Sequence, residues 1–196
     1  MNRKNLLTTF NRAFSLSSSI DKQSEIFVPA NIFDLNALKN DIVKNQLGED
    51  AIDEINHYLD KYNKLLPDDK DNRLVHADFD PSNILVDKMS GQDDAWKITG
   101  ILDWEFAFSG SILSDIANML RYSHKMPAEY EESFLKGLIK TNIILPKNWR
   151  VTINLLNILS LLDCLNRGKS KKTPNRCRDI CELVRHILKE LDDHKD

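Results

Sequence analysis

The sequence contains few of the residues that interrupt regular structure or cross-link small secreted domains. Its 196 residues include 6 Gly, 6 Pro and 3 Cys. The number of cysteines is odd, and Cys177 and Cys181 have the i, i+4 spacing of one helix face, which argues against a disulfide framework and for reduced, buried thiols. The low Gly and Pro content excludes collagen-like and low-complexity chains. Each Gly or Pro that does occur is therefore informative about where an element ends.

Long hydrophobic runs and an excess of one charge are also lacking. No apolar run approaches the roughly 18 to 20 residues that span a membrane, and the first residues do not form a signal sequence. The 27 Lys and Arg residues nearly balance the 30 Asp and Glu residues, giving a formal net charge of -3. This balance gives no general attraction for nucleic acid or an anionic membrane. We expect a cytoplasmic protein without nucleic-acid or membrane partners.

The pattern of apolar residues predicts helices, then a small β region, then helices again within a single domain of residues 1–196. A helical lead-in is expected over residues 1–70, with one helix near residues 6–14, one from Asp34 to Gly48 and one that ends at Pro67. Short apolar runs then predict three strands, at 74–75, 84–86 and 98–102, the last two joined as an antiparallel hairpin. Helical periodicity returns over residues 114–122, 127–140, 147–166 and 177–191.

One segment in the β region places acidic, amide and imidazole side chains at an informative spacing. His76, Asp78 and Asn83 follow the pattern His-x-Asp-x-x-x-x-Asn. In protein kinases, this Asp takes the proton of the attacking hydroxyl and this Asn binds Mg²⁺. In the expected hairpin, Asn83 and Asp103 lie opposite each other on neighbouring strands, about 4.8 Å apart. Their oxygens suit Mg²⁺, and Asp78 is then free to accept a proton.

These segments together resemble the aminoglycoside phosphotransferase family, a small-molecule branch of the protein-kinase-like fold. The family pattern comprises His-Gly-Asp-x-x-x-x-Asn, Ile-Asp-Trp/Phe and Gly-x-x-x-x-Asp, and its counterparts here are residues 76–83, 102–104 and 110–115. The resemblance implies that Asp78 is the catalytic base and that Asn83 and Asp103 hold Mg²⁺. It also implies that His76 and Asp115 support the loop. Ala77 replaces the usual Gly, which matters only if this residue adopts a positive φ angle.

One part of the family pattern is not found before the loop. The family places a glycine-rich strand-turn-strand over the nucleotide phosphates, together with a Lys-Glu pair. The 75 residues before His76 read as helices and contain one glycine, Gly48. We therefore expect an α+β, mainly helical fold that corresponds to the protein-kinase-like C-terminal lobe (C-lobe), with a small antiparallel β-hairpin carrying the metal site. Residues 74–115 hold the catalytic loop and hairpin, residues 114–196 form a helical substrate-side subdomain, and the N-terminal lobe (N-lobe) is absent or separately encoded.

The resemblance implies transfer of the γ-phosphoryl group of ATP or GTP to a hydroxyl of a small molecule of aminoglycoside type, with Mg²⁺ as cofactor. The alternative is a non-catalytic truncated remnant or a binding module of the same fold. A polycationic acceptor requires acidic walls, for which Asp80, Glu105 and Asp163 are candidates. Glu105 is equally consistent with a water-mediated contact to the metal or with a solvated loop residue, and Asp163 is equally consistent with a capped surface residue.

Two further clusters have an ordinary explanation beside a functional one. The basic residues between 167 and 178 suggest phosphate or nucleic-acid binding, but they lack interleaved aromatics, which favours a solvated loop between helices. Cys177, Cys181 and His186 fall at helical spacings and suggest zinc. Structural zinc normally takes four ligands from turns, so packing of a helix face is the favoured interpretation.

Overall fold

The computed structural model describes residues 35–68, 70–89, 95–167 and 174–194. These residues are mostly helical and include two antiparallel sheets of two strands each, in agreement with an α+β class. Its chain divides into two compact units, one built from the described residues between Pro67 and Lys147 and the other from those up to Leu66 and from Asn148 onward. None of the described helices is both long enough and apolar enough to cross a bilayer. The helix expected near residues 6–14 lies outside the described residues.

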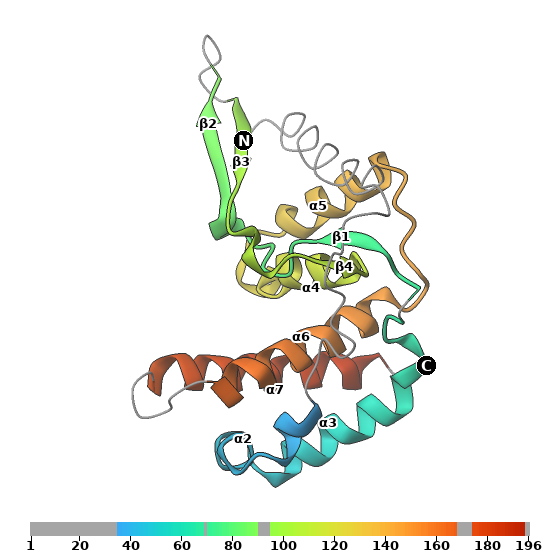
Figure 1. Ribbon diagram of the computed structural model, residues 1–196, viewed down its shortest axis with the longest axis vertical. Coiled ribbons are helices and arrows are strands. Elements are labelled where there is room, and N and C mark those ends of the chain that lie inside the picture. Colours follow the sequence, from blue (N-terminus) through green and yellow to red (C-terminus); the bar gives the residue numbers. More distant parts are fainter. Residues whose placement is uncertain (1–34, 69, 90–94, 168–173, 195–196) are drawn as a thin grey trace. The chain divides into compact units, whose positions relative to one another are not determined.

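The first unit contains all of the described strands (Figure 1). Their bounds are β1 (Arg73–Val75), β2 (Ile84–Lys88), β3 (Trp96–Ile101) and β4 (Phe108–Gly110). The predicted hairpin is confirmed as an antiparallel β2–β3 pair, with a register shift between Leu85 and Val86. Strand β4, which the sequence analysis did not predict, pairs antiparallel with β1. The chain therefore passes from one sheet to the other twice, once from β1 to β2 and once from β3 to β4.

Helices α4 (Leu113–Leu120) and α5 (Glu129–Lys140) complete this unit and confirm the helices expected over 114–122 and 127–140. Nearly every residue of α4 is buried, which is typical of a helix packed on several sides. Tyr130 of α5 donates a hydrogen bond to the carbonyl of Met119 at 2.8 Å. Burial of this hydroxyl raises the pKa of Tyr130 to about 12.

The second unit is helical in its described residues. It comprises the 3₁₀ turns η2 (Leu35–Lys39) and η3 (Asn63–Leu65) and the helices α2 (Asp41–Leu47), α3 (Glu49–Tyr62), α6 (Trp149–Arg167) and α7 (Pro174–Asp193). The continuous helix expected from Asp34 to Gly48 is wrong, because Asn40 separates η2 from α2. Its side chain accepts a hydrogen bond from the Ile42 N–H at 2.8 Å, as an N-cap residue does. Gly48 ends α2 as expected, with φ +89°.

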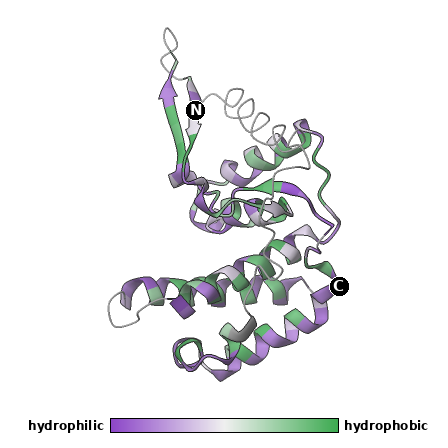
Figure 2. Cartoon of the chain, viewed as in Figure 1, coloured by the Kyte–Doolittle hydropathy of each residue, from purple (hydrophilic) through white to green (hydrophobic). Residues whose placement is uncertain are grey.

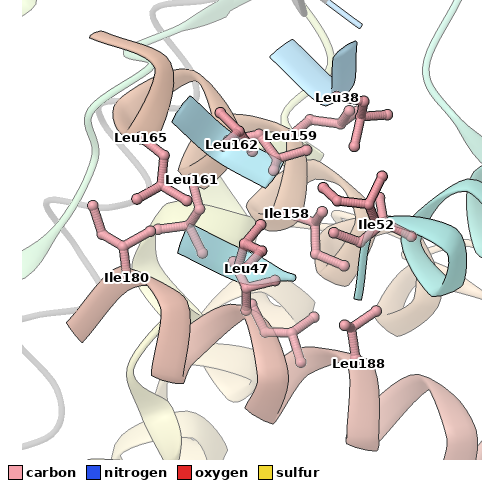
Figure 3. Packing of buried hydrophobic residues seen from close by; sticks show 14 of the residues in the cluster. Leu38, Leu47, Ile52, Ile158, Leu159, Leu161, Leu162, Leu165, Ile180 and Leu188 are labelled. Carbon is pink, nitrogen blue, oxygen red and sulfur yellow. The ribbon is translucent and has the colours of Figure 1, made fainter. Parts of the chain in front are cut away.

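Helix α6 lies at the centre of the second unit's apolar core (Figure 3). Leu155, Ile158 and Leu165 are fully buried, and α6 contacts α2, α3 and α7. Helix α7 instead alternates hydrophobic and hydrophilic residues, so that one face packs on α6 and the other is exposed (Figure 2). Cys177 and Cys181 belong to the packed face. Their burial in this core agrees with the packing interpretation of the two cysteines. Among the described residues, no group of three or more His, Cys, Asp or Glu could hold a metal.

Candidate active site

The loop that carries the predicted motif connects β1 to β2 in the first unit. Its second half is a short 3₁₀ turn, η4 (Pro81–Asn83), which Asp80 caps. Asp80 Oδ1 accepts hydrogen bonds from the Ser82 N–H at 2.6 Å and from the Ser82 hydroxyl at 2.5 Å. Pro81 stands at the first position of the turn, where its fixed φ angle is favourable and its missing N–H costs nothing. The sequence Asp-Pro-Ser-Asn therefore folds this part of the loop locally.

His76 joins the loop to the segment that follows β3. It is 1% exposed, and its Nε2 lies 2.7 Å from the carbonyl oxygen of Leu102. Its Nδ1 accepts a hydrogen bond from the Asp78 N–H at 3.3 Å. A carbonyl can only accept and an amide N–H can only donate, so these partners assign the neutral tautomer with its proton on Nε2. The ring also packs against Trp104, with 4.5 Å between centroids. These contacts are those expected of a residue that supports the loop, and this supporting role of His76 stays a prediction.

Asn83 lies close to Asp78, as the motif predicts. Its side-chain Nδ2 donates to the Asp78 carbonyl at 2.8 Å and to Asp78 Oδ2 at 3.2 Å. The side chains of both residues are partly buried. Because the amide nitrogen makes these contacts, the amide oxygen of Asn83 is the atom that suits a cation.

The expected position of Asp103 opposite Asn83 is wrong by one residue. The carbonyl of Asn83 accepts from the Leu102 N–H at 2.9 Å, so Leu102 is the residue opposite. Strand β3 ends at Ile101, and Asp103 turns out of the ladder with φ +65°, a left-handed conformation. Its exposed carboxylate follows directly after the residue that contacts both His76 and Asn83. The assignment of Asp103 as a metal ligand stays a prediction.

Asp115 of α4 accepts two hydrogen bonds from the loop backbone, the contact expected of it. The His76 N–H donates to Oδ2 and the Ala77 N–H donates to Oδ1, both at 2.9 Å. Asp115 is 4% exposed. Its burial raises the pKa of the carboxyl to about 6, against the opposing effect of the two backbone donors.

A polar residue that the sequence analysis missed lies one turn further along α4. Asn118 is 9% exposed and donates through Nδ2 to the carbonyl of Ala77 at 2.6 Å. A signal for it was present, because Asn118 interrupts an apolar helix three residues after Asp115 and therefore shares its face.

The acidic candidates for the acceptor site occupy different places. Asp80 is engaged with Ser82, and Glu105 is exposed in the 3₁₀ turn η5 (Trp104–Phe106) beside Asp103. Asp163 lies in α6, in the second unit, where it forms an ion pair with Arg167 one turn later. Their contribution to acceptor binding stays a prediction. Much of the basic cluster, residues 168–173, lies outside the described residues.

Ala77 has φ +71°, so the residue that replaces the family's usual Gly does adopt the conformation that Gly favours. A left-handed non-glycine residue destabilises the folded state by about 1 to 2 kcal/mol. Glycine removes this strain but also increases the conformational entropy of the unfolded chain, which offsets part of the gain. We expect Ala77→Gly to raise the unfolding free energy by about 0.5 to 1 kcal/mol, measured by urea denaturation. Ala107→Gly is the matched control, because Ala107 has φ -60° and its replacement is expected to lower stability. An Ala77→Gly variant that loses as much stability as the control contradicts the strain argument.

Comparison with known proteins agrees with this geometry. A model of the phosphotransferase enzyme family matches residues 27–151, which include the whole β1–β2 loop, the hairpin and Asp115. The chain belongs to this phosphotransferase enzyme family, and the resemblance seen in its motifs is confirmed. A search of curated proteins finds no match.

Proposed function

We propose that this protein transfers the γ-phosphoryl group of ATP or GTP to a hydroxyl of a small molecule, with Asp78 as the general base. The observation that carries the proposal is the joint placement of Asp78 and Asn83. One oxygen of the Asp78 carboxylate accepts from Asn83, and the backbone N–H of Asp78 is held by His76. Asp78 is thus held through its backbone N–H and through one carboxylate oxygen. The second carboxylate oxygen can accept the proton of an attacking hydroxyl.

Asn83, which contacts Asp78, and Asp103, which follows β3, carry oxygen ligands of the kind that Mg²⁺ binds. Asn83 offers an amide oxygen and Asp103 a carboxylate, and Mg²⁺ usually takes one or two protein oxygens and completes its shell with water and substrate phosphate. When bound, Mg²⁺ neutralises charge on the phosphate groups. The protein's own part is to hold the acceptor hydroxyl near Asp78 and to keep the loop in one conformation.

A second proposal concerns the cover of the nucleotide. In the described part of the chain, only helices and 3₁₀ turns precede β1, and Gly48 is the one glycine before the loop. Phosphoryl transfer depends on positioning and on charge stabilisation from both sides of the phosphates. We propose that the 196-residue chain alone binds Mg²⁺-nucleotide weakly. Full turnover is expected when an N-terminal lobe of a related phosphotransferase covers the site.

The test is transfer of labelled phosphate from ATP and GTP to aminoglycosides, macrolides, choline and sugars, with and without the added lobe. Nucleotide binding is titrated in parallel with and without Mg²⁺. Transfer to one acceptor class, enhanced by the lobe, supports the enzyme and names its substrate. Mg²⁺-dependent binding without transfer under any condition supports a binding module instead. Strong turnover by the 196 residues alone contradicts the need for the lobe.

The metal assignment has its own expected result. Asp103→Asn is expected to raise the Mg²⁺ concentration needed for half-maximal nucleotide binding by at least about tenfold, because it removes the charged ligand. Asp87→Asn is the matched control, since Asp87 is exposed on β2 and its carboxylate accepts from the N–H of the neighbouring Lys88. Equal Mg²⁺ titrations of the two variants contradict the assignment of Asp103.

A further inference from the structure

Helix α4 holds both backbone polar groups of Ala77. The Ala77 N–H donates to Asp115, and the Ala77 carbonyl accepts from Asn118 at 2.6 Å. The two side chains are three residues apart and project from one face of the helix. The residue between them, Ala77, is in the left-handed conformation at φ +71°. Both bonds therefore act on a residue whose side chain disfavours the conformation that it has.

The Asn118 contact also fixes the peptide plane that leads into Asp78. The Ala77 carbonyl and the Asp78 N–H belong to the same planar peptide group. Asn118 holds the carbonyl edge of this plane, and His76 Nδ1 accepts from its N–H edge at 3.3 Å. Rotation of the plane changes ψ of Ala77 and φ of Asp78, and so changes the direction of the Asp78 side chain. Loss of either of these two hydrogen bonds allows the peptide plane to rotate.

An amide is the side chain that suits this place. Asn118 Nδ2 faces a carbonyl, which can only accept, and its Oδ1 accepts from the Arg121 guanidinium, which can only donate. These partners determine which way the amide points. Aspartate at this position keeps the contact with Arg121. Its second carboxylate oxygen, however, faces the Ala77 carbonyl oxygen, and the two oxygens repel each other. Alanine removes both bonds at a buried site, where water does not readily replace them.

We propose that Asn118 is a positioning residue for Asp78: by holding the Ala77 carbonyl it keeps the Ala77–Asp78 peptide in the orientation that directs the Asp78 carboxylate to Asn83. The consequence for turnover rests on the proposed function. The consequence for the loop conformation does not.

The test combines Asn118→Ala with Ala77→Gly. Amide hydrogen exchange is followed at Ala77 and Asp78, with Leu120 of α4 as the internal reference. We expect Asn118→Ala to accelerate exchange at the two loop amides about tenfold relative to Leu120, as loss of one buried hydrogen bond does. We also expect kcat to fall about tenfold with KM unchanged. Addition of Ala77→Gly is expected to restore most of the protection and of kcat, because glycine adopts the left-handed conformation without the bond.

Two further variants separate positioning from general stability. Ile116→Val weakens the packing of the same helix at a fully buried position and is expected to leave the loop amides unchanged relative to Leu120. Asn118→Asp keeps the volume and the Arg121 contact, so it tests the same bond if Asn118→Ala does not fold. It is expected to accelerate exchange at the same two amides.

Uniformly faster exchange across α4 and the loop, or no rescue by Ala77→Gly, overturns the proposal and leaves Asn118 as a stabilising residue of α4 alone. A local, rescued change in exchange supports it. If that change occurs while the parent chain, tested with the lobe, transfers no phosphate, the proposed function fails and the positioning of the loop by Asn118 stands.

Discussion

Asp78→Asn is expected to transfer phosphoryl groups about 10²- to 10⁴-fold more slowly than the parent chain, measured with the added N-terminal lobe. An amide has nearly the shape of the carboxylate, so its oxygen can still accept from Asn83 Nδ2. The Asp78 backbone contact with His76 does not involve the side chain and is retained. The variant therefore preserves the loop and removes the proton acceptor, and the loss is expected in kcat with KM little changed.

The control for Asp78→Asn is Asp87→Asn, which makes the same change of charge on the exposed surface of the hairpin. It is expected to retain the parent rate. Thermal unfolding of both variants is followed to show that they remain folded. Full activity of Asp78→Asn, with normal Mg²⁺ dependence, removes Asp78 from the role of general base.

Asp115→Ala is expected to have the largest effect on stability. It leaves the N–H groups of His76 and Ala77 without their acceptor in a buried place, at about 1 to 3 kcal/mol for each donor. For a chain of this size, each kcal/mol lowers Tm by about 2 to 4 °C. We expect phosphoryl transfer to fall as well, because both bonds hold the residues that precede Asp78. An unchanged Tm contradicts the bracing role and leaves Asp115 as a favourable acid in the first turn of α4.

Asp115→Asn adds a pH test of the same bonds. Burial raises the pKa of Asp115 to about 6 in the folded protein, above its ordinary value of 3.8. The folded state thus binds the proton more tightly than the unfolded state, and this contribution to stability is present below pH 3.8 and is lost as the pH rises through 6. The two-unit difference corresponds to about 3 kcal/mol. The parent chain is expected to lose this advantage relative to Asp115→Asn between about pH 4 and 6, measured by urea denaturation across that range. Parallel pH profiles contradict the raised pKa.

The elements that the sequence predicted correctly are those whose signal is local. The stripe of Ile52, Ile55 and Leu59 gave α3, and the apolar runs around residues 84–86 and 98–102 gave the hairpin, because periodicity within one element depends on its own side chains. Strand β4 has three residues, which are too few to give a recognisable alternating pattern in the sequence. Its conformation depends on pairing with β1, which is distant in the sequence, and no local pattern predicts such a partner.

The site divides in the same way. Asp78 and Asn83 follow from spacing within one loop, and the loop geometry agrees with it. The register places Leu102 opposite Asn83, and Asp103 leaves the ladder in a left-handed conformation that the sequence does not mark. The role of Asn118 depends on a carbonyl 41 residues away in the chain. Contacts of this kind depend on the packing of α4 against the loop, and single sequence motifs do not predict them.

The double passage between the two small sheets has a consequence for how this sequence can change over evolutionary time. Residues 76–83 lead from β1 to β2, and residues 102–107 return from β3 to β4, so both connections span the same two ladders. The Leu102 N–H donates to the Asn83 carbonyl, and the Leu102 carbonyl accepts from His76 Nε2, so Leu102 joins the two connections. An insertion in one of them changes its span while the other stays the same, and the contacts of Leu102 with His76 and Asn83 are then disturbed. We therefore expect chains that diverge from this one to keep the lengths of the two connections together.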